Sequence, residues 1–215
     1  MSSAGRKRSR GGVGRPGPRR ADGLPAGPSE VRAAVIAAAS ELFVHRGVAG
    51  VSLRDIAEAA QVNPALISRY IGSRAQLVRT VFEDLTDQLV AEIRSEPTAS
   101  RGFEPDRVMN RWTLVLTHLV IVDPEAAAGI GSAVVDELAG QIQRLYGQTT
   151  DGARLRAAQL MGSAIGWRVF EPYLVASSGL SGTPIEDLRT ELNRTHRRLA
   201  ATPYPSPPDP PTNVD

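Results

Sequence analysis

Hydrophobic residues recur at helical spacing along most of the chain, and glycine, proline and capping residues divide them into separate segments. The first segment predicts a helix that starts near Ser29 and ends before Gly47, a suitable residue just past a helix end. Its apolar positions fall on one helical face: Val35, Ala38, Ala39, Leu42 and Phe43. We expect this face to be buried against the segments that follow.

Residues 52–74 predict two short helices joined by a tight turn. Ser52 is a suitable N-cap for the first helix, and Asn63 followed by Pro64 suits the start of the second. The apolar positions of the pair are Leu53, Ile56, Ala57, Ala60 and Ile67. This layout is a helix-turn-helix, whose second helix is placed in the major groove of DNA. DNA is therefore the first partner that the sequence indicates.

A long fourth helix follows, with Gly72 ending the second short helix and Ser73 capping the next. Its apolar stripe contains Leu77, Val81, Phe82, Leu85, Leu89 and Ile93. After a break at residues 97–105, the pattern predicts a helix at about residues 106–122. A pair of helices follows Pro124, is divided near Gly131 and ends at Gly147. Two more helices are predicted, one at about residues 150–176 and one that starts at Thr183 and Pro184. No stretch has a β-rich pattern, so the predicted fold class is all-α, with about nine helices.

These segments divide the chain into four parts. Residues 1–28 are an Arg-rich arm with little to bury, which we predict to be disordered. Residues 29–80 form an N-terminal domain of three helices with the helix-turn-helix, and residues 81–202 form a second, helical domain. Residues 203–215 contain six prolines and are predicted to be disordered or extended.

Charge is distributed unevenly along the chain. Residues 1–28 hold seven basic residues and one acid (net +6), and residues 29–80 hold six and four (net +2). The remaining residues, 81–215, hold twelve basic and eighteen acidic residues (net −6). A basic N-terminal end favours a polyanion as its partner. The chain has no cysteine and no apolar run of the length that a bilayer requires, so we expect a cytoplasmic protein without disulfides.

The N-terminal pattern resembles the TetR (tetracycline-repressor) family of bacterial transcription regulators. The matching positions are Arg32, Ala33, Ala34, Val35, Ile36, Ala38, Ala39, Leu42, Phe43, Gly47, Ser52, Ile56, Ala57, Ala60, Val62, Pro64, Ile67, Gly72, Ser73, Arg74 and Leu77. They cover about residues 30–80, and the rest of the chain agrees in helix count and length. The resemblance implies a homodimer whose second domain binds a small-molecule effector and carries the dimer interface.

Several positions depart from the family pattern. Gln61 stands at the usual turn glycine, so the turn is made either without a positive φ or with some strain. Ser68 replaces the usual tyrosine of the recognition helix, Ile71 replaces the aromatic residue after it, and Ala65 is a mild change. The fold prediction is unaffected, whereas the operator contacts are expected to differ from those usual in the family.

The resemblance implies that the second short helix offers outward side chains to base edges: Pro64, Ala65, Leu66, Ser68 and Arg69. Arg69 is the best candidate for a hydrogen-bonded contact, because a guanidinium matches the O6/N7 edge of guanine; a phosphate contact is the alternative. Arg54 either reads guanine or pairs with Glu58 four residues on.

Contacts to the DNA backbone are assigned to Ser52, Tyr70 and Arg74, with packing over Leu77 as the alternative for Tyr70. Within the arm, Arg15, Arg19 and Arg20 are predicted to contact DNA. The short motif at residues 14–17 suits a minor-groove hook, and the alternative is a non-specific electrostatic arm.

Bulky residues of the second domain are candidates for a ligand pocket, or else plain core: Met109, Trp112, Leu116, Trp167, Phe170 and Tyr173. Ala158, Gly162 and Gly166 are small residues four apart, which permits close approach of another helix. With Leu188 and Leu192 of the last helix, they form the dimer interface that the family resemblance implies. The alternative is packing of the same face within the chain.

These observations predict a sequence-specific DNA-binding regulator, a repressor released from its operator by a small molecule. The competing hypothesis is a non-specific or architectural DNA-binding protein driven by the basic arm. Catalysis is not expected, because the three imidazoles, His45, His118 and His196, stand in no metal-ligand or nucleophile motif. We therefore predict no metal, no cofactor and no membrane association.

Overall fold

The structure is a computed structural model that describes residues 24–25, 27–95 and 107–203. This part of the chain contains eight α-helices and no strand: α1 (Pro28–Arg46), α2 (Leu53–Ala59), α3 (Pro64–Tyr70), α4 (Arg74–Ser95), α6 (Arg107–Val122), α7 (Pro124–Tyr146), α8 (Thr150–Ser177) and α9 (Ile185–Ala201). The all-α prediction is confirmed, and the number of described helices is close to the nine expected. None of these helices is long and apolar enough to cross a membrane.

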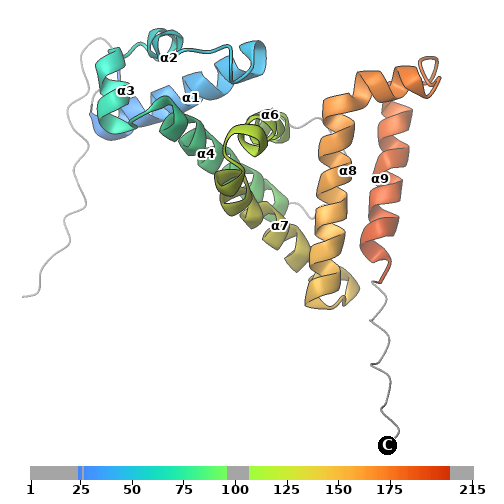
Figure 1. The fold of residues 1–215 in the computed structure, drawn as a ribbon. Coiled ribbons are helices and arrows are strands. Elements are labelled where there is room, and N and C mark those ends of the chain that lie inside the picture. Colours follow the sequence, from blue (N-terminus) through green and yellow to red (C-terminus); the bar gives the residue numbers. More distant parts are fainter. Residues whose placement is uncertain (1–23, 26, 96–106, 204–215) are drawn as a thin grey trace, which may run out of the picture.

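Helices α1, α2 and α3 form a head at one end of the molecule, and α4 leads from it into a body built with α6 and α7 (Figure 1). Helices α8 and α9 lie side by side at the other end. The predicted division between residues 80 and 81 falls inside α4, so one continuous helix belongs to both parts.

The head is held together by one face of α1. Its buried apolar residues are Val31, Val35, Ala39 and Phe43, and α2 and α3 pack against α1 with Ile56, Ala57 and Ile67 buried. The helix begins at Pro28, one residue earlier than predicted, and its N-cap is Gly27, which makes no side-chain cap. Gly47 follows the last helical residue with a φ of 71°, a value that favours glycine.

Helix α4 begins with a reciprocal cap. Ser73 Oγ accepts a hydrogen bond from the Gln76 N–H (3.2 Å), and Gln76 Oε1 accepts one from the Ser73 N–H (2.7 Å). The predicted cap at Ser73 is therefore confirmed. The whole predicted apolar stripe of α4 is buried as well. These two features fix where the helix starts and which face it turns to the body.

The body packs around a pair of aromatic rings. Phe82 of α4 and Trp112 of α6 are stacked with centroids 5.5 Å apart, and both are buried. The indole Nε1 of Trp112 donates a hydrogen bond to Thr86 Oγ1 at 2.9 Å, so the buried polar atom has a partner.

The predicted division near Gly131 is wrong, because α7 is one continuous helix. A Cβ placed on Gly131 would lie 3.7 Å from Phe82 and 3.8 Å from Trp112. These are ordinary van der Waals distances, so Gly131 lies inside a packed helix beside the aromatic pair and marks no helix break.

The two ends of α9 are held differently. Helix α9 begins at Ile185 after Pro184, so the predicted cap by Thr183 is replaced by a start without a side-chain cap. Near its other end, Arg156 of α8 donates from Nε to the Thr202 carbonyl (2.9 Å) and from Nη2 to the Pro203 carbonyl (3.2 Å). These bonds satisfy carbonyls that the end of a helix leaves without partners.

Candidate nucleic-acid interface

Ser52 begins α2 with a capping box. Its Oγ accepts from the Asp55 N–H (3.2 Å) and donates to Asp55 Oδ2 (2.6 Å), while Asp55 Oδ2 accepts from the Ser52 N–H (2.8 Å). Arg46 at the end of α1 contacts the other carboxylate oxygen at 3.2 Å. The hydrogen bonds from Ser52, aided by Arg46, lower the pKa of Asp55 to about 2. The cap is confirmed, and the ion pair between α1 and α2 is a contact that the sequence analysis missed.

The turn between α2 and α3 places Gln61 in the left-handed region, with a φ of 54°. Its N–H donates to the Glu58 carbonyl (3.1 Å), and the Val62 N–H donates to the Ala57 carbonyl (2.9 Å). This pair of bonds is a Schellman motif, in which the residue at the position of Gln61 is usually glycine. Of the two alternatives for this turn, the one with a positive φ is therefore correct.

Helix α3 turns one face outward. Asn63 caps it by accepting from the Ala65 N–H (2.9 Å), as predicted. Four of the candidate base-reading residues are exposed: Pro64, Ala65, Ser68 and Arg69. Leu66 is half-buried and packs against the core, so it offers less of its side chain than the sequence analysis expected.

Arg69 and Tyr70, at the end of α3, are in contact. The Arg69 guanidinium carbon lies 5.5 Å from the centroid of the Tyr70 ring. Tyr70 is half-buried and packs against the core, whereas Arg69 is exposed. On α2, Arg54 is exposed, and no ion pair joins it to Glu58 within the described part of the chain.

Arg74, predicted to contact phosphate, has a structural partner in the head. Its Nε and Nη2 donate to the Val51 carbonyl (3.3 and 3.1 Å), and Nη2 also donates to the Val48 carbonyl. The guanidinium thus ties the start of α4 to the loop between α1 and α2. This accounts for a cation at a helix start without DNA, and the phosphate contact stays a prediction. Burial and the charge of Arg74 lower the pKa of His118 on α6.

The arm and tail predictions lie largely outside the described residues. This includes the expected DNA contacts of Arg15, Arg19 and Arg20.

The predicted pocket residues do not gather in one place. Trp112 is buried in the aromatic pair of the body, and Met109 and Leu116 are half-buried against the same core. Phe170 and Tyr173 are 55% and 68% exposed on α8. Trp112 thus fits the plain-core alternative, and Phe170 lies on an outer surface, because tertiary packing and not helical spacing decides which aromatic residues become enclosed.

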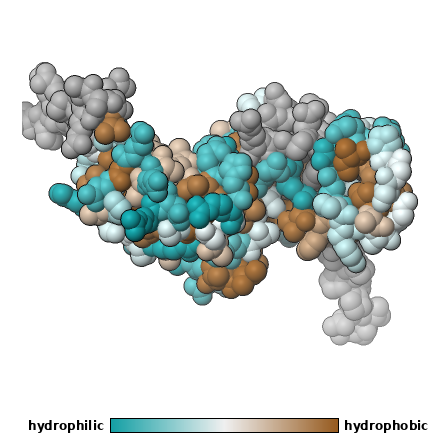
Figure 2. Space-filling view, turned by 90° about the horizontal axis from the view of Figure 1, so that it is seen from above, coloured by the Kyte–Doolittle hydropathy of each residue, from teal (hydrophilic) through white to brown (hydrophobic). Residues whose placement is uncertain are grey.

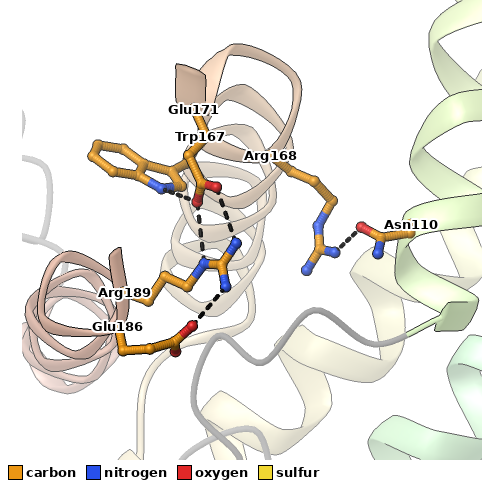
Figure 3. Close-up of polar contacts among 6 residues, drawn as sticks. All are labelled: Asn110, Trp167, Arg168, Glu171, Glu186 and Arg189. Atoms are coloured by element: carbon orange, nitrogen blue, oxygen red, sulfur yellow. Dashed lines mark hydrogen bonds and ion pairs between the residues drawn. The ribbon is translucent and has the colours of Figure 1, made fainter. Parts of the chain in front are cut away.

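Trp167, the remaining pocket candidate, belongs to a polar cluster between α8 and α9 (Figure 3). Its Nε1 donates to Glu171 (3.0 Å), which also accepts from Nε and Nη2 of Arg189 (3.1 and 2.9 Å). Glu186 pairs with Nη1 of Arg189 at 3.0 Å. The contact with Glu171 is the first cause that raises the pKa of Arg189, and the cluster links α8 to α9.

The predicted dimer stripe of α8 is only partly covered by the chain's own packing. Ala158 and Gly162 are exposed, and a Cβ on Gly162 or Gly166 would meet nothing within 4 Å. Gly166 is half-buried, so packing within the chain leaves Ala158 and Gly162 uncovered and covers Gly166 in part. Leu188 and Leu192 of α9 are half-buried. Seen from above, hydrophobic patches lie among pale residues over the α8–α9 end (Figure 2).

Comparisons with known proteins point in one direction. Residues 35–81 match the family model of bacterial regulatory proteins of the tetR family. The chain is 32% identical over 177 residues to the HTH-type transcriptional repressor Rv3405c of Mycobacterium tuberculosis, a match covering 82% of this chain and 92% of that protein. The HTH-type transcriptional regulator Mb3439c of Mycobacterium bovis matches with the same identity and coverage.

Solved structures show the same fold. A tetR-family transcriptional regulator from Streptomyces coelicolor superposes with a TM-score of 0.57 at 21% identity, covering 81% of this chain and 82% of that chain. A TetR transcriptional regulator from Legionella pneumophila gives a TM-score of 0.52 at 18% identity, with 79% and 97% covered.

Proposed function

The chain belongs to the TetR family of bacterial regulatory proteins, and from this premise we propose that it is a homodimeric repressor that a small molecule releases from its operator. Sequence-specific DNA binding and transcriptional regulation follow from the family itself. The dimer, the release by an effector and the residue roles below are the proposed part.

The outward face of α3 carries the proposal for DNA reading. Ile67 is fully buried, and this anchors the helix to the head while Ala65, Ser68 and Arg69 stay exposed. Arg69 reads a guanine from this face, and Ala65 and Ser68 approach neighbouring base edges. Arg54, exposed on α2 and not paired with Glu58, is the second candidate for a base contact.

The partly uncovered stripe of α8 supports the dimer. A two-fold interface is self-complementary, so a projecting side chain of one copy must meet a recess on the other. On α8, Gly162 and Gly166 offer no side chain, and they lie along the same face of the helix as the exposed rings of Phe170 and Tyr173. If two α8 helices cross near Gly166, Phe170 of each copy packs over Gly162 of the other.

Two ion pairs support a route from an effector in the body to the head. Arg111 of α6 pairs with Glu41 of α1. Arg79 of α4 donates from Nε to Asp123 Oδ2 (2.6 Å), and Asp123 Oδ1 accepts from a backbone N–H in the first turn of α7 (3.3 Å). A displacement of α6 therefore acts on α1 through Arg111, and a displacement of the start of α7 acts on α4 through Asp123. Release follows when the effector binds better to the arrangement whose recognition helices no longer match the operator.

Selection of bound DNA from a random pool, with purified full-length protein, tests the proposal. A palindromic consensus with half-sites about one helical turn apart, or a multiple of that distance, supports the dimeric reader. Binding without sequence preference, with a steep salt dependence, would instead support the competing hypothesis of an electrostatic DNA-binding protein.

The dimer has its own matched test. Gly162→Leu places a bulky side chain on the proposed interface of α8, while Gly129→Leu adds the same side chain at an exposed glycine of α7 whose Cβ also meets nothing within 4 Å. Sedimentation should show dissociation for the first variant and not for the second. Equal dissociation constants for both variants would place the interface elsewhere.

Release is tested on the protein–operator complex with a small-molecule library. An effector must bind the free protein more tightly than the protein–operator complex. A compound with equal affinity for both states would not change the equilibrium between them. Compounds that stabilise the free protein without lowering operator occupancy count against the mechanism.

A further inference from the structure

Tyr70 lies under the guanidinium of Arg69, although the two residues are neighbours in one helix. Side chains at adjacent positions of a helix do not normally face each other. Here Tyr70 is the last residue of α3, and the Arg69 guanidinium carbon lies 5.5 Å from its ring centroid. This distance is within the range of cation–π contacts. The guanidinium of Arg69 therefore lies over the ring at the end of α3.

The two residues differ in how firmly they are held. Tyr70 is half-buried and packs against the head, so its ring is fixed by the core. Arg69 is exposed, and no carboxylate of the described residues forms an ion pair with it. The ring of Tyr70 is thus the contact that limits the conformations of Arg69 in the free protein.

An arginine side chain with few accessible conformations is well suited to recognising a base. An arginine side chain has much rotamer entropy, and a planar guanidinium that is already held in place loses less of it when it forms two hydrogen bonds. A cation–π contact with the ring occupies no hydrogen-bond acceptor, so the guanidinium N–H groups of Arg69 remain available to a guanine.

We propose that Tyr70 is a positioning residue that orients the Arg69 guanidinium for base reading, acting through its ring and not through its hydroxyl. The inference rests on the proposed role of Arg69 as the guanine reader. It differs from the phosphate contact expected of Tyr70, because that contact requires the hydroxyl and carries no sequence information.

The test measures binding of full-length variants to the selected operator and to operators changed at single base pairs. Arg69→Ala first identifies the base pair whose preference depends on Arg69. Tyr70→Phe keeps the ring and should retain affinity and preference. Tyr70→Leu should weaken operator binding about 2- to 5-fold, the range of an exposed cation–π contact, with the loss confined to that base pair.

A double-mutant cycle separates positioning from general damage to the fold. Tyr70→Leu should have no further effect on affinity in the Arg69→Ala background. It should keep its full effect in an Arg54→Ala background, which removes an equal charge from α2. The proposal would be overturned if Tyr70→Leu lowered operator affinity equally in the Arg69→Ala and Arg54→Ala backgrounds. A loss of affinity for all DNA sequences alike in Tyr70→Phe would also overturn it.

The outcomes also separate this inference from the proposed function. If Arg69→Ala leaves every base preference unchanged while the protein still binds a palindrome, the regulator stands and the inference fails. If no sequence is preferred by the unchanged protein, the proposed DNA reading itself fails.

Discussion

Replacing Gln61 with glycine is expected to stabilise the protein. Gln61 is the one residue other than glycine with a positive φ in the described part of the chain. Its side chain is exposed, and the hydrogen bonds of the turn run through the backbone, from Gln61 to Glu58 and from Val62 to Ala57. Glycine would keep these bonds and remove the contact between Cβ and carbonyl that makes this region unfavourable.

The size of the effect follows from two opposing terms. The left-handed conformation costs an ordinary residue about 1–2 kcal/mol. Glycine loses more backbone entropy on folding, which offsets about 0.5–1 kcal/mol of the gain. The net increase in the free energy of unfolding therefore lies between about 0 and 1.5 kcal/mol, and its midpoint of about 0.75 kcal/mol corresponds to a Tm higher by roughly 1.5–3 °C for a chain of this length.

Urea unfolding of the full chain at one fixed protein concentration measures this difference. Gln61→Ala is the matched control, since it removes the same side chain and keeps the unfavourable φ, and it should gain little. Gln61→Asn should lie between, because asparagine tolerates this region better. The reasoning is refuted if the glycine variant is no more stable than the alanine variant, or if the m-value changes.

Three further results are expected. Thr86→Val should cost about 1–3 kcal/mol in urea unfolding because the buried Nε1–H of Trp112 loses its acceptor, and Thr86→Ser, which keeps the hydroxyl, should cost less. Gly72→Ala should destabilise by about 1–2 kcal/mol, since φ is 108° and the new Cβ would lie 2.1 Å from the Gln76 Oε1 that caps α4; a stability equal to the unchanged protein would contradict this. Burial lowers the pKa of His196, so the unfolded state takes up a proton first and the free energy of unfolding should fall as the pH drops below about 6.5. His196→Gln should flatten this dependence in unfolding titrations from pH 7.5 to 5, and an unchanged slope would exclude His196 as a source.

Features of the fold that depend on neighbouring residues could be predicted from the sequence. The caps at Ser52, Asn63 and Ser73 involve partners two or three residues away, and all three are present. The buried stripe of α4 was also predictable, because helical spacing alone brings its members to one face. The burial of Ile67 and the exposure of Ser68 on α3 were predictable for the same reason.

Contacts between distant segments could not be predicted in this way. Arg74 bonds carbonyls 23 and 26 residues earlier, and its charge at a helix start was therefore assigned to DNA alone. The local pattern at Gly131 predicts a break, whereas α7 continues through it and packs there beside Phe82 and Trp112, which lie on other helices. Phe170 and Trp112 have similar local patterns and opposite burial, which depends on where α6 and α8 pack.

Helix α4 also sets a length scale for regulation. Its 22 residues span about 33 Å at 1.5 Å per residue, and its first turn is fastened to the head by Arg74. A rod of this length, pivoted at its far end, moves its near end by roughly 0.6 Å for each degree of tilt. A tilt of about six degrees therefore displaces α3 by one base-pair step of roughly 3.4 Å. Under the proposed mechanism, a change of a few degrees in the angle of α4 is enough for an effector to move the two heads of the dimer out of register with the operator.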